Sequence, residues 1–210
     1  MVLRNIQCLK LTKKNAAQTS CYILMMRTKN FYLLLATMFF GLISYFMVSP
    51  VSQTYQIDLG IPSAVAVSAV MLGSIVNAGA RLVLPTLADK VGRIVCIKGV
   101  LIVAVIAMGV LAVSRSLAVT VAVVLMYGCY GGIMGSFPSL TSSIFGMKHT
   151  GENYGFVMFG IVFATFGAPA ISGLVSSNGY EMNVVFGIGA VFAVIALVCL
   201  TLLGRNLVKE

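Results

Sequence analysis

The sequence predicts an all-α integral membrane protein, a bundle of six transmembrane helices. Three observations support this fold class. The 210 residues are 60% hydrophobic and only 9% charged, whereas a soluble domain is about one quarter charged. Six segments of about 20 or more mostly apolar residues are each long enough to cross a hydrocarbon core about 30 Å thick. The loops between these segments are too short to hold a separate soluble domain.

The six predicted helices follow one another from residue 31 onwards. Their approximate bounds are 31–53, 62–87, 94–113, 117–143, 154–176 and 183–204. Pro62 opens the second helix, where proline is tolerated because the first turn has no partner for its missing N–H. We therefore expect residues 31–210 to form the bundle and residues 1–30 to be a basic cytoplasmic lead-in.

Basic residues lie mostly on one side of this predicted bundle. Six of the 14 Lys and Arg residues fall within residues 1–30, and others follow the second, fourth and sixth helices. The loops on the opposite side contain only Arg115. Because basic loops stay in the cytoplasm, both termini are predicted to be cytoplasmic, with the chain in the plasma membrane. The net charge of +9 is thus attributed to loops beside anionic lipid, and no nucleic-acid partner is expected.

The sequence lacks the residue sets on which most enzymes and metalloproteins depend. Its five cysteines form no CxxC pair, so they are expected to be reduced packing residues. His149 is the only histidine, which argues against a His-rich metal site and against a Ser-His-Asp triad. A glycine-rich phosphate loop is also lacking. We therefore expect neither an enzyme nor a cofactor or metal.

The second helix carries a charge inside an apolar run. Ser74, Asn77 and Arg81 are separated by three and four residues, which places them on one helix face. A charge within a bilayer costs from about 2.5 kcal/mol upward, so it should face a cavity or a partner. We expect Arg81 to bind an anion, because its planar fork suits a carboxylate. The alternative is a structural cation that reaches the interface or bonds backbone carbonyls.

Tyrosines are further candidates for lining a substrate pathway. In the first helix, Tyr45, Ser49 and Gln53 are spaced by four residues, which indicates either a second cavity-facing stripe or an interhelical hydrogen-bonding face. Tyr127 and Tyr130 in the fourth helix could offer hydroxyls or ring faces to a substrate. The alternative role of such a pair is packing within the bundle.

The fourth helix also contains paired glycines. In "YGCYGGIMGSFP" (127–138), Gly128 stands four residues before Gly132, and Gly131 four residues before Gly135. This spacing lets helix backbones approach closely in lipid. The run therefore predicts a tight contact with a neighbouring helix.

The loop after the second helix combines opposite charges with a glycine. In "LADKVGR" (87–93), Asp89 stands beside Lys90 and Arg93, and Gly92 allows a tight turn. Asp89 can cap the following helix or hold an ion pair at the cytoplasmic face. Such a pair can be made in one state and broken in another, so these residues are candidates for a gating loop.

This loop resembles the loop signature of the major facilitator superfamily, approximately G-x-L-x-D-R/K-x-G-R, which lies between the second and third helices of each half of those transporters. Pro85 stands where the signature begins with glycine. The matching residues are Leu87, Asp89, Lys90, Gly92 and Arg93.

Four longer stretches together resemble the C-terminal six helices of the oxalate/formate antiporter family, over about residues 22–204. The resemblance implies that Arg81, preceded by Ala80 where the family has glycine, matches a candidate carboxylate ligand. It also places Ile161 near a position where oxalate-type members carry a second cation, lysine. This argues against oxalate and towards a monoanion or another small carboxylate. The stretches are "KNFYLLLATMFFGLISYF", "NAGARLVLPTLADKVGR", "YGCYGGIMGSFPSLTSSIFG" and "ENYGFVMFGIVFATFGAP".

The resemblance implies one half of a major facilitator fold, with the first 20 or so residues similar to a remnant of the central loop. The expected function is transport of a small carboxylate by alternating access. The expected partners are the lipid bilayer and a second six-helix half, from a separate chain or a homodimer. A truncated fragment or assembly partner without transport of its own, and a pore-forming oligomer, remain as alternatives. The residues do not distinguish exchange from proton coupling.

Overall fold

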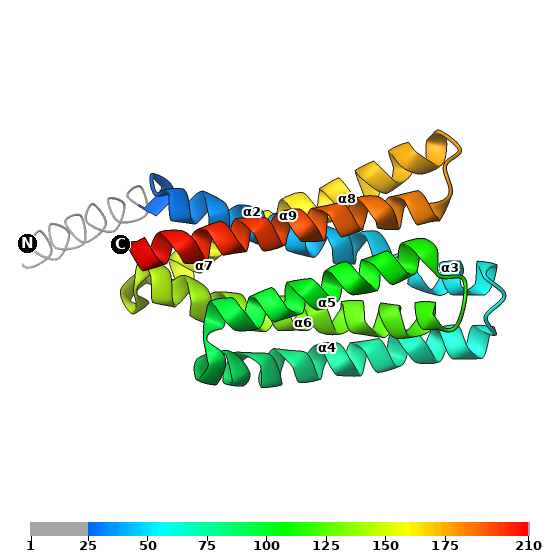
Figure 1. Ribbon diagram of the computed structural model, residues 1–210, viewed down its shortest axis with the longest axis horizontal. Helices are drawn as coiled ribbons and strands as arrows, with labels where there is room; N and C mark the ends of the chain where they lie inside the picture. Colours follow the sequence, from blue (N-terminus) through cyan, green and yellow to red (C-terminus); the bar gives the residue numbers. More distant parts are fainter. Residues whose placement is uncertain (1–24, 210) are drawn as a thin grey trace, which may run out of the picture.

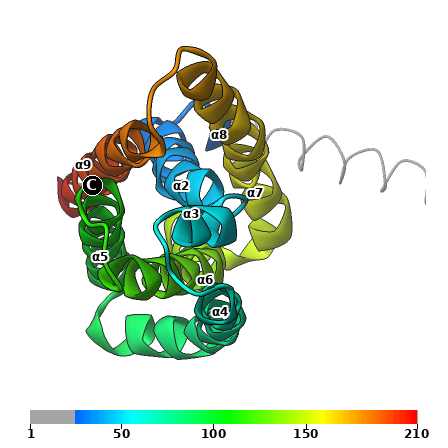
Figure 2. The same cartoon turned by 90° about the vertical axis from the view of Figure 1, so that its right-hand side faces the viewer.

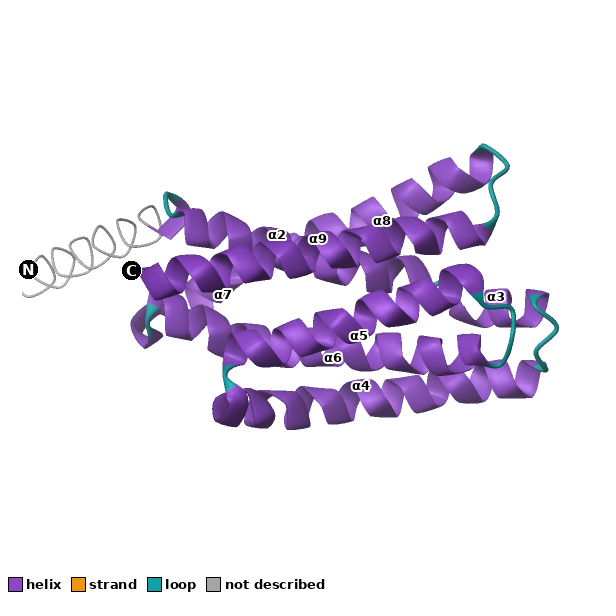
Figure 3. Ribbon diagram, in the orientation of Figure 1, coloured by secondary structure: helices purple, strands orange, loops and turns teal. Residues whose placement is uncertain are grey.

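The computed structural model describes residues 25–209, and every regular element in this part of the chain is helical (Figure 3). Six helical spans are long and apolar enough to cross a membrane, which confirms the predicted all-α six-helix fold class. Most of the predicted lead-in lies outside the described residues. The spans are α2 (Lys29–Val48), α4 (Ser63–Val91), α5 (Arg93–Val113), α6 (Ala118–Phe145), the consecutive α7 (Thr150–Val157) and α8 (Phe159–Ser177), and α9 (Met182–Lys209).

The first membrane helix ends earlier than the sequence predicts. α2 stops at Val48, and a separate short helix, α3 (Ser52–Asp58), follows. Pro50 has no N–H to donate to the carbonyl of Phe46, so the helical hydrogen bonding is interrupted there. The predicted helix 31–53 therefore covers α2, this break and the start of α3.

The fifth span consists of two helices that meet at Met158. The N–H of Met158 still donates to the carbonyl of Tyr154 at 2.9 Å, and its carbonyl accepts from Ile161 at 2.9 Å. Hydrogen bonding thus continues across the junction, and residues 150–177 behave as one apolar span of 28 residues. A short 3-10 helix, η1 (Met147–His149), connects α6 to this span.

α2 lies at the centre of the bundle, between α7 and α8 on one side and α9 and α5 on the other (Figure 2). It is the most buried of the six spans. The buried Ser44 hydroxyl donates to the carbonyl of Gly189 at 2.8 Å and so joins α2 to α9.

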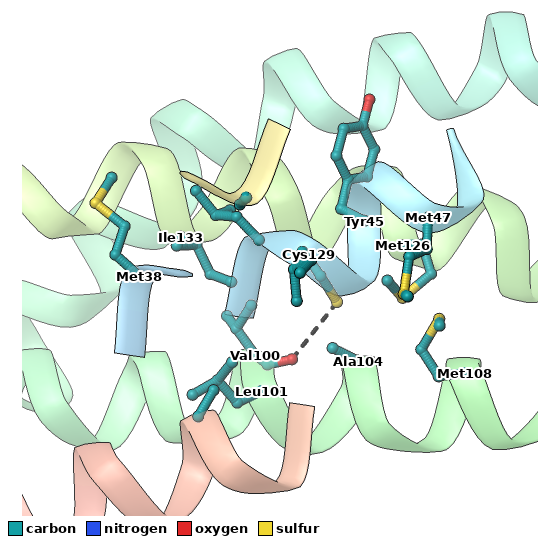
Figure 4. Packing of buried hydrophobic residues seen from close by; sticks show 14 of the residues in the cluster. Met38, Tyr45, Met47, Val100, Leu101, Ala104, Met108, Met126, Cys129 and Ile133 are labelled. Carbon is teal, nitrogen blue, oxygen red and sulfur yellow. Dashed lines mark hydrogen bonds between the residues drawn. The ribbon is translucent and has the colours of Figure 1, made fainter. Parts of the chain in front are cut away.

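Methionines and aliphatic residues fill the core around α2. The thiol of Cys129 points from α6 to the carbonyl of Val100 on α5, 3.5 Å away, whereas the hydroxyl of Tyr45 points away from this cluster (Figure 4). Methionine suits such a core because its unbranched side chain fills irregular gaps. The fully buried core members include Met38, Met47, Met108 and Met126.

α4 and α6 pack closely at the glycines of α6. A Cβ atom on Gly131 would lie 2.6 Å from Oδ1 of Asn77 and nearer still to that residue's carbonyl oxygen. A Cβ atom on Gly135 would lie 2.8 Å from the carbonyl oxygen of Arg81 and 3.1 Å from Cγ of Pro85. Real Cβ atoms do not approach backbone so closely, so only glycine permits this contact. The glycine spacing in the sequence predicts it.

Pro85 lies inside α4 and does not end the helix. Because proline has no N–H, the carbonyl of Arg81 lacks its usual helical donor four residues later. That carbonyl faces α6 at Gly135. Replacement of the signature glycine by Pro85 therefore leaves the packing close here, since the glycine that allows it belongs to α6.

Polar contacts join the loops at the opposite end of the bundle from the α4–α5 turn (Figure 1). Arg115 pairs with Glu181 at 2.9 Å. The Tyr55 hydroxyl of α3 lies 2.8 Å from Oδ1 of Asn183 and 3.1 Å from the carbonyl oxygen of Leu111, so its proton can reach either acceptor. Burial raises the pKa of the Tyr55 phenol above its usual value, so it stays a donor at neutral pH.

We expect Gly131→Ala to destabilise the bundle strongly, because the new methyl group would collide with the backbone of Asn77. Overpacking of this kind costs about 1–3 kcal/mol. Gly109→Ala is the matched control, since nothing lies within 4 Å of a Cβ atom there. Thermal unfolding in detergent should show a lower midpoint for Gly131→Ala alone. Equal midpoints for the two variants would contradict the close α4–α6 contact.

Candidate functional site

Arg81 is held by two contacts on the exposed side of α4. Its Nε donates to Oδ1 of Asn77 at 3.3 Å, one helical turn earlier. Its Cζ lies 5.5 Å from the centre of the Tyr130 ring on α6, within range for a cation–π interaction. Because Asn77 precedes Arg81 in α4, the guanidinium is directed away from the α4–α5 turn. It is therefore not directed towards the membrane interface at that turn.

Three tyrosines from α2 and α6 pack against one another, and one of them, Tyr130, contacts this arginine. The rings of Tyr45 and Tyr130 stack with centres 4.2 Å apart and planes inclined by 12°. Tyr127 meets Tyr45 edge-on at 5.3 Å and is buried against Gly73 of α4. We call Arg81, Asn77, Tyr45, Tyr127 and Tyr130 the Arg81 cluster. The structure thus brings all five predicted substrate-binding residues together.

Tyr154 of α7 is a further member that the sequence does not single out. The positive charge of Arg81 reaches the hydroxyls of both Tyr45 and Tyr154. Tyr154 lies in the stretch "ENYG". The polar residues of this stretch are as typical of a helix start as of a binding site. Nothing in its spacing separates it from a packing residue. Only the tertiary fold, which places α7 beside α2 and α6, reveals its position.

No carboxylate of the described residues pairs with Arg81. Asp89 pairs with Arg93, and Glu181 pairs with Arg115. The two terminal nitrogens of Arg81 are therefore available to an anion in this part of the chain. In the same range there is no group of three or more His, Cys, Asp and Glu residues that could hold a metal ion.

The polar stripes predicted on the two helices are only partly formed. On α4, the hydroxyl of Ser74 donates to the carbonyl of Val70 at 2.9 Å and serves its own helix. The hydroxyl of Ser49 donates to that of Tyr45 at 3.3 Å, next to the cluster. Gln53 is exposed on α3, so the predicted stripe through Gln53 is not continuous.

The predicted gating residues form the turn between α4 and α5. Gly92 has φ of +105°, a conformation that glycine adopts readily. Asp89 accepts from Arg93 at 3.3 Å, within the turn, and does not cap α5, whose N-cap residue is Gly92. Lys90 is exposed at the end of α4. An open cavity of about 580 Å³ adjoins Asp89, Gly92 and Arg93, with α6 and α9 on its other side.

The six apolar spans define a multi-pass membrane protein. A family model described as the Major Facilitator Superfamily matches residues 9–161, which is most of the chain. The chain therefore belongs to the Major Facilitator Superfamily, whose members are membrane transporters and not enzymes.

Two curated relatives are similar to the chain over part of their length. The oxalate:formate antiporter of Oxalobacter formigenes is 25% identical over 175 residues, which are 82% of this chain and 42% of that protein. The uncharacterized MFS-type transporter YhjX of Escherichia coli (strain K12) is 36% identical over 97 residues, which are 45% of this chain and 24% of that protein. The chain thus spans less than half the length of the curated relatives it matches.

We expect Asp89→Asn to have little effect on stability, because the Asp89–Arg93 pair is exposed and confined to one turn. Such pairs contribute about 0.3–0.5 kcal/mol. Glu181→Gln, which removes the other exposed pair, is the matched control, and thermal unfolding in detergent is the measurement. A large drop in the midpoint for Asp89→Asn alone would mean that Asp89 holds the fold together, which would remove the case for a gating role.

Proposed function

We propose that this six-helix unit is one half of a secondary transporter that moves a small carboxylate across the membrane, with Arg81 as the carboxylate ligand. One observation supports the proposal: Arg81 is held in position but is not paired with a carboxylate. Its Nε is fixed by Asn77, while its terminal nitrogens have no carboxylate partner among residues 25–209. A guanidinium held in this way can offer two parallel N–H donors to an incoming carboxylate.

The other members of the cluster have separate roles in this proposal. Asn77 orients the guanidinium, and the stacked rings of Tyr45 and Tyr130 form a firm aromatic wall beside it. Tyr154 adds a phenol hydroxyl within electrostatic reach of Arg81. A hydroxyl at this place could donate to a second oxygen of the substrate. Tyr127 is buried and supports the wall from behind.

The charge available at the site favours a monoanion. Ile161 on α8 stands near the place where the resemblance to oxalate-type transporters leads one to expect a lysine, so one cation faces the substrate. One guanidinium balances one carboxylate, whereas a dianion such as oxalate would retain an unbalanced charge once a second six-helix unit covers the site. We therefore propose formate or a comparable small monocarboxylate as the substrate class.

Transport further requires a second six-helix unit, supplied by a separate chain or a second copy. In transporters built of two such halves, the site lies between them and the halves rock around it. The exposure of Arg81 on the surface of the bundle supports this arrangement. We propose that the α4–α5 turn, with Asp89, Lys90, Gly92 and Arg93, contributes to gating. We further propose that the chain lies in the plasma membrane, with both termini on the cytoplasmic side.

A second candidate is an assembly subunit that does not transport alone. The observation in its favour is that the alignment covers only 42% of the oxalate:formate antiporter. Uptake by the reconstituted chain with and without a co-expressed N-terminal six-helix half distinguishes the two. Uptake by the chain alone supports a homodimer, and uptake that needs that half and is lost in Arg81→Gln supports a transporter of two separate chains. Uptake that needs that half but is unchanged in Arg81→Gln supports the assembly role.

We expect Arg81→Gln to reduce formate uptake into proteoliposomes severely. Hydrogen bonds to a charged group contribute about 1.5–3 kcal/mol, so the loss should be roughly 10–150-fold at limiting substrate. Arg81→Lys keeps the charge but not the fork, and should retain more uptake than Arg81→Gln. Uptake of labelled formate and of labelled oxalate is measured in parallel, with the chain alone or with the N-terminal half, according to which of the two is active.

Arg115→Gln is the matched control, because Arg115 is an exposed arginine of the α5–α6 loop that pairs with Glu181 and does not belong to the Arg81 cluster. Uptake should be unchanged by this substitution. Unaltered uptake by Arg81→Gln, in a variant that elutes from gel filtration like the parent, would refute the role of Arg81. Preference for oxalate over formate would refute the monoanion assignment alone.

A further inference from the structure

An apolar groove lies between α4 and α5 on the side of α4 away from α2. It has a volume of about 480 Å³ and is floored by Gly128 and Cys129 of α6. Its lining side chains are all aliphatic, apart from glycine and cysteine. Leu87, Val91 and Val95 are exposed in the groove wall, so the groove opens outward from the bundle.

The groove and the Arg81 cluster are separate. The groove is lined by α4, α5 and α6, whereas the cluster takes its aromatic rings from α2 and α6 and is joined by Tyr154 of α7. On α4 the groove uses Val76, Ala80 and Leu84, about a quarter turn around the helix from Asn77 and Arg81. The groove is therefore not part of the proposed substrate site.

The groove is long enough to hold an acyl chain over the depth of one leaflet. Its α4 wall runs from Val76 to Val91, a length of about 22 Å at the helical rise of 1.5 Å per residue. The hydrocarbon of one leaflet is about half of the 30 Å core. A chain that enters at the α4–α5 turn can thus lie along the groove as far as the middle of the bilayer.

A lysine at the end of α4 adjoins the last α4 residue of the groove wall in the sequence. Lys90 is exposed and precedes the wall residue Val91. It has no acidic side chain within ion-pair distance in residues 25–209, in contrast to Arg93, which is paired with Asp89. A lysine at the end of a membrane helix attracts anionic headgroups.

We propose that this groove binds one anionic phospholipid, with an acyl chain between α4 and α5 and the headgroup phosphate at Lys90. In a bilayer the apolar chain gains no hydrophobic energy by leaving other lipids, so its preference for the groove arises from closer packing and from the charge of Lys90. Gly99 keeps the α5 wall open, because nothing lies within 4 Å of a Cβ atom placed there.

The test uses phosphatidylglycerol with a photoreactive diazirine in mid-chain, in phosphatidylcholine vesicles that contain the full chain. After illumination, mass spectrometry should locate most adducts on peptides of the groove wall, around Gly99 and Val103. Gly99→Leu should lower these adducts by roughly tenfold, because the new side chain occupies the space of the acyl chain. Gly109→Leu, outside the groove and equally free of neighbours, should leave them unchanged.

Two further results bear on the proposal. Lys90→Gln should reduce the preference for phosphatidylglycerol over phosphatidylcholine about fivefold. Adducts spread evenly over the outward faces of α8 and α9 in the parent protein would overturn the proposal, and this result does not depend on the folding of any variant.

Discussion

The close contact between α4 and α6 fixes the position of Arg81. In lipid no hydrophobic force drives helices together, so association depends on van der Waals packing of close backbones. Gly131 and Gly135 provide that packing, and their neighbours on α4 are Asn77 and Arg81 themselves. The same contact therefore holds two helices together and sets the direction of the guanidinium. It also places the Tyr130 ring of α6 under the arginine.

The two contacts of Arg81 do not use its terminal nitrogens, which remain available to an anion. A cation–π contact at an exposed site contributes about 0.5–1 kcal/mol, and the bond to Asn77 adds a hydrogen bond to a charged group. Both use Nε or the ring face of the guanidinium. Arg81 reaches back along α4 towards Asn77, which does not fit a side chain that extends to the interface at the α4–α5 turn. The sequence left both interpretations open, and this direction argues against the interfacial one.

Local patterns in the sequence predicted the spans and much of the cluster, and failed where tertiary position decides. Apolar length revealed six spans, and the four-residue spacing of the glycines in α6 indicated a close helix contact without identifying α4 as the partner. The break before α3 was missed because the predicted helix 31–53 was extended past Pro50, which has no N–H for the helical hydrogen bond. Tyr154 was missed because its proximity to Arg81 depends on α7 packing beside α2 and α6, which helical periodicity within one segment cannot express.

The two outer sides of α4 require different surroundings. It is the least buried of the six spans, and lipid satisfies its groove side because the lining there is apolar. Lipid does not satisfy the other side, where Arg81 and Asn77 carry unused polar groups. We infer that a second six-helix unit covers the Arg81 side and leaves the groove in lipid. Such a cover would enclose Arg81 in a medium of lower dielectric, and so strengthen its attraction for an anion over the value at an open surface.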